Sequence, residues 1–460
     1  MSRTSSDGRA FTRAFWWITG VTTAVAAVFL LLGAMQGPKL STAQIDSVRA
    51  TEQAGQQLRL FANQPLSDIS AEQVRVEPAV PVQVSVQGEL IAVQFERALD
   101  YSTEYTVTVT GVASPSRGAT SDFVHSFTTA PGSFLYVDRG DAVDEVLVAD
   151  VGGTGRGEVL HTAAGIQFAA PVENALVVVR DDGAAGSVLE VVDRASDAVE
   201  QVRLPADGLR VDELATPRVG TTVALVLSSV EPGEGAPDRW LALVDLAGAG
   251  VAEWAVGLDG EPIAAREALF TPSGDALLVH DVDQALLRLP LADPTLILPV
   301  AQFTEVHSLS NDGRRLSATD PFGGVALELE STDEERINPS LFDDQLVFGA
   351  DFHLLGSGEW VQRVAVTDAS GLAVANLIVV DDGSGQSRLL ARTVDDAGSF
   401  VDFRVSPNDQ FVAIEVVPVV ADAQPDGRAV NGRATSITIV IVNIATGELV
   451  RSVAGFAPSW

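Results

Sequence analysis

Ile437 to Val453 read ITIVIVNIATGELVRSV: an apolar strand, a turn around Thr446-Gly447, and a second strand of more mixed character. The same hairpin recurs from Trp240 as WLALVDLAGAGVAEWAV and from Val188 as VLEVVDRASDAVEQVRL. Its copies begin near Val146, Val188, Trp240, Ala285, Val325, Asn376 and Ile437, at separations of 42, 52, 45, 40, 51 and 61 positions. A repeat at this spacing is typical of a protein built from four-stranded units.

A second marker precedes most copies, namely a turn that leads into a strongly apolar strand. Examples are TPSGDALLV from Thr271, SNDGRRL from Ser310 and SPNDQFVAI from Ser406. In such turns proline presets φ, Asp or Asn caps the backbone, and glycine tolerates positive φ. These turns, and the hairpin ends LVDLAGAG and IVNIATGEL, resemble those of TolB-like and WD-repeat propellers. The resemblance covers residues 133–460 and implies a β-propeller of about seven blades, without implying an activity.

The two ends of this region predict how the ring closes. Phe134-Leu135-Tyr136-Val137 runs directly into the hairpin at Val146, so the first copy lacks an inner strand. After the last hairpin, Ala454 to Trp460 is long enough for one strand. We therefore expect the C-terminal strand to complete blade one, which would remove the exposed sheet edge.

Residues 40–130 alternate apolar and polar side chains in short runs, a pattern typical of a β-sandwich. The runs are 58–62, 74–77, 82–86, 90–95, 105–112 and 123–128. Three stretches, 61–66, 99–109 and 125–129, resemble bacterial immunoglobulin-like domains of surface-layer and cell-wall proteins. The resemblance implies a spacer domain in which the hydroxyl of Tyr105 bonds back to the backbone.

Ala14 to Met35 contain no charged side chain. As a helix, these residues would reach about 33 Å, enough to cross a hydrocarbon core of about 30 Å. Arg3, Arg9 and Arg13 precede the stretch, which predicts a cytoplasmic N-terminus over residues 1–13 and an extracytoplasmic remainder. A cleaved signal peptide is the alternative, although the run is long and its exit lacks an A-x-A site. We expect an uncleaved, single-pass transmembrane anchor over residues 14–35 in the cell membrane.

The composition excludes several functions. With 29 Lys+Arg against 62 Asp+Glu, a net charge of -33 argues against nucleic acid as a partner. The absence of cysteine excludes thiol nucleophiles and zinc-thiolate sites. No G-x-S-x-G, H-E-x-x-H or Walker A motif occurs, and the five histidines are scattered as expected of structural residues. We predict no catalytic residue, metal or cofactor from the sequence.

Two long insertions are the candidate binding loops. Residues 229–239 and 418–435 each separate the second and third strands of a blade, where long loops on a rigid scaffold usually bind. A tolerated surface insertion explains them equally well, because lengthening a loop costs only about 0.6 kcal/mol per doubling. The candidate residues are Glu231, Glu234, Asp238, Arg239, Asp422, Asp426, Arg428, Asn431 and Arg433.

The fold class expected is therefore all-β: an N-terminal transmembrane helix, an immunoglobulin-like sandwich and a propeller. The expected function is that of a membrane-anchored scaffold that binds an unknown envelope protein or polysaccharide. The alternative is a propeller hydrolase or lyase that acts on envelope polysaccharide, which would need carboxylates converging on the propeller axis.

Overall fold

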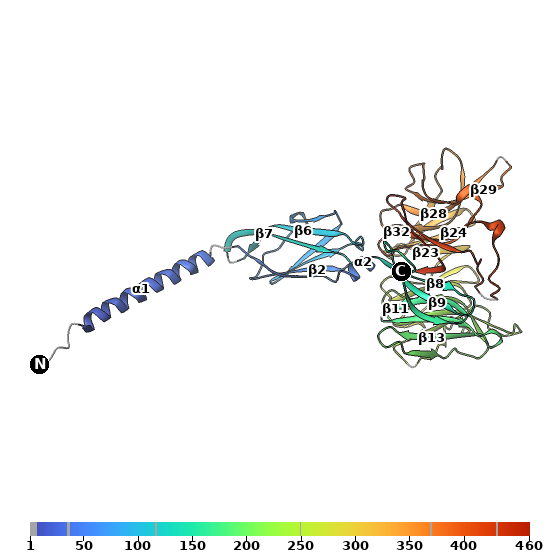
Figure 1. Cartoon of the computed structure of the whole chain (residues 1–460), viewed down its shortest axis with the longest axis horizontal. Helices are drawn as coiled ribbons and strands as arrows, with labels where there is room; N and C mark the ends of the chain where they lie inside the picture. The colour runs from blue at the N-terminus through green and yellow to red at the C-terminus, as the bar shows by residue number, and fades with distance from the viewer. Residues whose placement is uncertain (1–6, 35–36, 116, 249, 369, 429–430) are drawn as a thin grey trace. The chain divides into compact units, whose positions relative to one another are not determined.

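A computed structural model describes residues 7–34, 37–115, 117–248, 250–368, 370–428 and 431–460 of this chain (Figure 1). The chain divides into two compact units, which meet in sequence at Ala130 and Pro131. Apart from one long N-terminal helix, the short helix α2 and a few single-turn 3-10 helices, the regular elements of the described residues are β-strands. The expectation of an all-β architecture after the N-terminal segment is confirmed.

The N-terminal helix α1 (Asp7–Ala34) has 28 residues and covers most of the apolar stretch. Residues 1–6 and Met35, which belong to the predicted cytoplasmic and membrane segments, lie outside the described residues. Within the described part, no helix has the combined length and apolar character that a membrane crossing requires. The transmembrane anchor therefore has no support from the structure and stays a prediction.

The rest of the first unit consists of two sheets with strand orders β1-β2-β5-β4 and β3-β6-β7. The strands are β1 (Leu40–Gln44), β2 (Gln57–Ala62), β3 (Val74–Glu77), β4 (Val82–Gln87), β5 (Leu90–Phe95), β6 (Glu104–Ser114) and β7 (Arg117–Thr128), with a short helix α2 (Arg49–Glu52) after β1. Side chains from both sheets form one core, including Leu60, Val93 and Val107. Tyr105 is buried in it, and its hydroxyl accepts a hydrogen bond from the Asp100 N–H at 3.1 Å, as predicted. The immunoglobulin-like assignment goes beyond this two-sheet description and stays a prediction.

The described part of the second unit holds seven four-stranded sheets, which agrees with the predicted blade number. In each blade the strands run, from the inner to the outer position, in the following order. Blade 1 is β35 (Phe456–Ser459), β8 (Ser133–Arg139), β9 (Asp144–Asp150), β10 (Glu158–Ala163); blade 2 is β11 (Ile166–Val172), β12 (Ala175–Asp181), β13 (Ser187–Asp193), β14 (Val199–Val202). Blade 3 is β15 (Leu209–Ala215), β16 (Thr222–Ser229), β17 (Trp240–Asp245), β18 (Glu253–Trp254); blade 4 is β19 (Ala265–Phe270), β20 (Ala276–Asp281), β21 (Ala285–Pro290), β22 (Leu298–Gln302). Blade 5 is β23 (Glu305–Leu309), β24 (Arg315–Asp320), β25 (Gly323–Glu328), β26 (Glu334–Ile337); blade 6 is β27 (Val347–Leu354), β28 (Trp360–Thr367), β29 (Ala373–Asp381), β30 (Arg388–Arg392). Blade 7 is β31 (Ser399–Val405), β32 (Phe411–Val417), β33 (Thr438–Asn443), β34 (Leu449–Ala454).

The apolar cores of the propeller lie between neighbouring blades. One cluster joins Val179 of blade 2 to Leu225 of blade 3, and another joins Val361 of blade 6 to Ile414 of blade 7. The second strands are therefore covered on both faces, and every residue of β32 is buried. A strand with two covered faces needs a continuous apolar run, which is why the second strands were the easiest to find in the sequence.

The ring closes as the sequence predicts. Strand β35 pairs antiparallel with β8, with Phe456 opposite Val137 and Ser459 opposite Leu135. The buried ring of Phe456 packs in the cluster that also contains Val146 of β9 and Ile166 of blade 2. The last strand of the chain thus serves as the inner strand of the first blade and pairs the edge that β8 would otherwise leave open.

The antiparallel connections define two faces of the propeller. The loop face carries the connections from second to third strands and from each outer strand to the next inner strand. The turn face carries the connections from inner to second and from third to outer strands. Both long insertions, 230–239 between β16 and β17 and 418–437 between β32 and β33, lie on the loop face.

Candidate functional site

The first insertion leaves three of its four candidate residues in solvent. Glu231, Glu234 and Asp238 are exposed, and none of them makes an ion pair with a described residue. Arg239 turns inward instead: its Nε donates to the Ala265 carbonyl at 3.0 Å, and its Nη2 lies 3.5 Å from Glu213 Oε2. Arg239 therefore ties blade 3 to the inner strand of blade 4.

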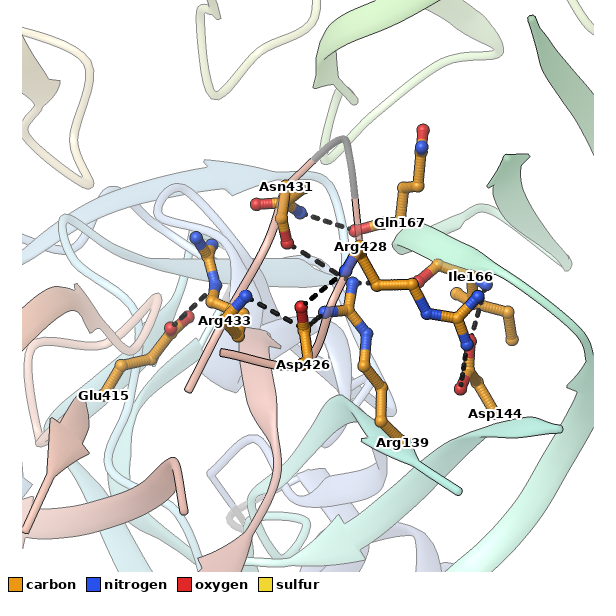
Figure 2. Close-up of polar contacts among 9 residues, drawn as sticks. All are labelled: Arg139, Asp144, Ile166, Gln167, Glu415, Asp426, Arg428, Asn431 and Arg433. Atoms are coloured by element: carbon orange, nitrogen blue, oxygen red, sulfur yellow. Dashed lines mark hydrogen bonds and ion pairs between the residues drawn. The ribbon is translucent and has the colours of Figure 1, made fainter. Parts of the chain in front are cut away.

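The second insertion folds back over the seam where blade 7 meets blade 1 (Figure 2). Asp426 organises its turn, because its carboxylate accepts the N–H groups of Arg428 at 3.0 Å and Arg433 at 2.9 Å. The same carboxylate forms an ion pair with Arg139 at the end of β8, and only 12% and 10% of these two side chains are exposed. Asp426 is thus a buried structural anchor as well as a candidate residue.

Two further candidate residues of this loop contact blades 1 and 2. The Asn431 side chain donates to the Gln167 carbonyl at 2.7 Å, and its own carbonyl accepts from Arg139 Nη2 at 3.3 Å. Arg428 Nη2 lies 3.4 Å from both carboxylate oxygens of Asp144. Asp144 is fully buried and also accepts the Ile166 N–H at 2.8 Å, so the loop bridges two blades (Figure 2).

Arg433 completes this arrangement from the side of blade 7. Its Nε lies 3.6 Å from Glu415 Oε2, and Glu415 Oε1 accepts the Ala457 N–H of β35 at 2.8 Å. Burial raises the pKa of Glu415, and Arg433 opposes that rise. The guanidinium carbons of Arg139 and Arg433 lie 4.5 and 5.7 Å from the centre of the Phe456 ring. We call Arg139, Asp144, Glu415, Asp426, Arg428, Asn431 and Arg433 the seam cluster; it braces the ring closure.

The remaining candidate of this loop, Asp422, is exposed. A hollow of about 420 Å³ lies beside it, lined by Val401 of β31, residues 423–428 and 432–434, and Ile437. The nine candidate residues therefore do not converge on one site. Four are exposed carboxylates, and the other five hold blades together; whether any of them binds a partner stays a prediction.

Two carboxyl groups that no sequence motif singles out lie side by side on inner strands. Glu213 of β15 accepts the Ala268 N–H at 3.4 Å, directly beside Glu267 of β19. Partial burial raises the pKa of Glu213 to about 7. Burial, and then repulsion from Glu213, raise the pKa of Glu267 to about 8. Both groups therefore hold a proton close to neutral pH, as a general acid would.

The surroundings of this pair are polar and charged. Glu267 Oε2 is buried and makes no hydrogen bond to any described residue. Asp351 of β27 also repels Glu267, but its own carboxylate is paired with Arg363 at 2.5 Å. Among the described residues, no group of three or more His, Asp and Glu is arranged to hold a metal ion. The sequence shows this pair only as one acidic residue in each of two inner strands. Because the chain has 62 Asp and Glu residues, such a pattern does not single out a site.

Polar contacts between non-adjacent blades tie the propeller together on the turn face. Asn311, in the first turn of blade 5, donates to the Ser406 carbonyl at 2.8 Å and to Asp409 Oδ1 at 2.5 Å in blade 7. Arg218, in the first turn of blade 3, donates to Asn311 Oδ1. Bonds between blades 3, 5 and 7 can form only near the axis, so the turn-face end of the axis is held by this network.

Large apolar side chains are exposed on many connections of the loop face. They are Val143, Val256, Leu258, Val282, Phe322, Leu346, Phe348, Leu372, Val374, Val394, Val419 and Val420. On the turn face they lie at outer strands and the connections into them, at Val159, Val199, Val251, Leu296, Leu298, Leu389, Leu449 and Val450, and none of these is more than 60% exposed. Single exposed apolar residues are normal, but a concentration on one face marks an interaction surface.

Comparisons with known proteins identify no family. No protein-family model matches the sequence, and a search of curated proteins gives no match. Similar solved structures include the dihydro-heme d1 dehydrogenase NirN in complex with DHE, at 15% identity over 71% of this chain and 74% of that one, with a TM-score of 0.43. A putative 6-phosphogluconolactonase from Bacteroides fragilis gives 14% identity over 71% of this chain and 96% of that one, with a TM-score of 0.43. The Cps50 (Swd1) β-propeller domain from Myceliophteria thermophila gives 14% identity over 64% of this chain and 88% of that one, with a TM-score of 0.37. These likenesses concern the fold alone, and the propeller assignment rests on the seven sheets themselves.

Proposed function

We propose that this protein is an extracytoplasmic binding or scaffold protein, whose propeller binds an envelope protein or polysaccharide through its loop face. The observation that carries the proposal is that the propeller's most exposed apolar side chains, such as Phe322, Leu346 and Leu372, all lie on that face. Burying such side chains against a partner contributes roughly 25 cal/mol per Å² of apolar surface. The rigid, ring-closed scaffold would keep the connections in place for a partner.

Photo-crosslinking in intact cells tests which face binds. A photoreactive amino acid at Phe322 or Leu372 on the loop face should give covalent adducts. The same residue at Leu296 or Val251 on the turn face is the matched control and should give none. All four side chains are exposed, so the substitutions should leave folding intact. Adducts that form equally on both faces, or only on the turn face, would refute the proposal.

We also propose that residues 14–35 hold the chain at the membrane, with residues 1–13 in the cytoplasm. The uncharged stretch and the arginines before it support this part, together with the exposed indole rings of Trp16 and Trp17. Extraction of cell membranes with alkaline carbonate should leave the chain in the membrane pellet, and external protease should digest the residues after 40. Release into the supernatant, or protection from protease, would contradict it.

The second candidate function is that of a hydrolase or lyase for envelope polysaccharide. The specific observation in its favour is the neighbouring pair Glu213 and Glu267, because polysaccharide hydrolysis commonly uses two carboxyl groups of which one holds a proton. Purified cell-wall polysaccharide of the producing organism should then release new reducing ends with the native protein and not with Glu213→Gln or Glu267→Gln. Equal release with either variant would exclude this role for the pair.

A further inference from the structure

We propose that the loop face of blade 6 binds a positively charged segment of a partner protein that also carries apolar side chains. This inference rests on the proposed function and adds the place on the face and the chemistry of the partner. It follows from three features of blade 6: an apolar patch, unpaired carboxylates around it, and arginines that are already engaged.

The apolar patch of blade 6 consists of Leu346, Phe348, Leu372 and Val374. Their exposed fractions are 78%, 64%, 67% and 51%. Strand pairing places them at one end of one sheet, since Val347 lies opposite Val366 and Val366 lies opposite Ala375. A contiguous group of exposed apolar side chains such as this one marks a site of interaction with another molecule.

Blade 6 also extends further than its neighbours. Strands β28 and β29 have eight and nine residues, whereas β24 and β25 of blade 5 have six each and β32 and β33 of blade 7 have seven and six. The end of β29 with its adjoining connection is visible at the upper right of the propeller in Figure 1. Longer strands carry the apolar patch away from the scaffold and towards a partner.

Three carboxylates without a cation adjoin the patch residues in the sequence. Asp343 and Asp344 come just before Leu346, and Asp368 comes just before Leu372; all three are exposed. Among the described residues, no arginine or lysine lies within ion-pair distance of these three. Hydrogen bonds from Ser370 lower the pKa of Asp368, so that carboxyl is charged at neutral pH.

Three arginines of blades 5 and 6 already have carboxylate partners. Arg336 pairs with Asp320 at 2.5 Å, Arg363 with Asp351 at 2.5 Å, and Arg392 with Asp396 at 2.7 Å. The charge that remains for a partner is therefore negative. A partner that brings Lys or Arg next to apolar side chains would complement both features at once.

The same charges argue against other occupants. A second copy of this chain would bring a net charge of -33 against a face that is itself acidic. Anionic lipid headgroups and nucleic acids would be repelled in the same way. A cationic, apolar protein segment is the occupant that the surface favours.

Three short synthetic peptides with a fluorescent label test the inference against the full-length chain by fluorescence anisotropy. One contains leucine and lysine, the second leucine and glutamate, and the third serine and lysine. Only the leucine–lysine peptide should bind well, and raising the salt concentration should weaken its binding because exposed charges become screened. Equal binding of the leucine–glutamate peptide would overturn the inference.

Paired variants locate the binding. Replacing Leu346 and Leu372 by Ser should weaken leucine–lysine binding about tenfold or more, from the lost apolar burial. Asp343→Asn with Asp344→Asn should weaken it about threefold and flatten its salt dependence. The matched turn-face controls are Leu296→Ser with Leu298→Ser, and Glu330→Gln with Glu334→Gln, all exposed; they should bind as the native chain does.

The outcomes separate this inference from the proposed function. Equal losses in the turn-face controls would mean that the peptide senses only the overall charge, and would overturn the inference. If crosslinks at Phe322 and Leu372 still form in cells, the proposed function would stand with a partner of different chemistry. Thermal melts of all variants check that each is folded, which is expected because every substituted side chain is exposed.

Discussion

At the scale of single residues, two carboxyl groups carry the strongest chemical signal in the propeller. Glu213 and Glu267 have pKa values of about 7 and about 8, against an ordinary value of 4.5. Both are raised mainly by burial, so the folded protein favours the protonated form. The unfolded chain loses these protons at lower pH, and the native state is therefore destabilised progressively as the pH rises from about 4.5 to about 8.

The prediction from this linkage concerns the variant with Glu213→Gln and Glu267→Gln. Relative to the native chain, its free energy of unfolding should be higher at pH 8 than at pH 5 by at least about 1 kcal/mol. Urea denaturation at the two pH values measures the difference. Glu231→Gln with Glu234→Gln, on an exposed loop, is the control. A difference from native that is the same at both pH values would show that the two carboxyl groups titrate normally.

The sequence predicted some residue contacts and could not have predicted others. The Tyr105 hydroxyl bond was predictable because its partner, Asp100, is five positions away in the same corner of the sandwich. Arg139 and Asn431 meet across 292 positions of sequence. Only the closed ring brings them together, so the sequence showed Asn431 and Arg433 as loop residues and could not show that they brace the seam.

At the scale of elements, the second long insertion, residues 418–437, holds blade 7 against blade 1, and Asp426 lies at the centre of its contacts; we call this insertion the latch. Asp426→Ala removes the carboxylate that forms an ion pair with Arg139, whose side chain is only 12% exposed. Removing one member of a buried pair typically costs about 3 kcal/mol, so the melting temperature of the propeller should fall by several degrees. Asp422→Ala in the same loop is exposed and should change stability by less than about 0.5 kcal/mol. Equal melting temperatures for the two variants would mean that the latch does not stabilise the ring.

The closing strand β35 gives a second prediction at this scale. Deleting residues 455–460 removes the partner of β8, the buried Phe456 ring and the Ala457 N–H that Glu415 accepts. The exposed edge of β8 and the lost burial should lower the melting temperature markedly or cause aggregation. Deleting Trp460 alone keeps the strand and should have a much smaller effect. Differential scanning calorimetry of the two truncated chains measures the difference in melting temperature. Indistinguishable curves would contradict the role of β35 in closing the ring.

Most elements were predictable because their patterns are local. The second strands read as continuous apolar runs, as in β32, and the Asp/Gly/Pro turns marked their starts. The hairpin repeat predicted the blades. The absence of an inner strand before β8 predicted that the C-terminal strand closes the ring. The lengths of short strands were harder to predict: the hairpin from Trp240 was predicted, but its second strand, β18, has only two residues, too few for a period of its own.

At the scale of the whole molecule, the antiparallel connectivity decides which loops share a face. The hairpin repeat in the sequence was enough to predict this grouping of the loops. Which side chains stay free on that face did not follow, because packing decides it. Five of the nine candidate residues make contacts between blades, whereas Phe322, Leu346 and Leu372, which no motif marks, are exposed. We therefore propose that a partner is recognised on the loop face, with blade 6 as its apolar and acidic part.

Hydrogen–deuterium exchange of the full-length chain, with and without the partner that the crosslinks identify, tests this central claim most directly. Partner binding should slow amide exchange in peptides that cover residues 320–324, 344–350 and 370–376 on the loop face. Exchange in the turn-face segments 291–298 and 310–314 should not change. Protection confined to the turn-face segments, or protection of the sandwich alone, would contradict the claim that the loop face of the propeller binds the partner.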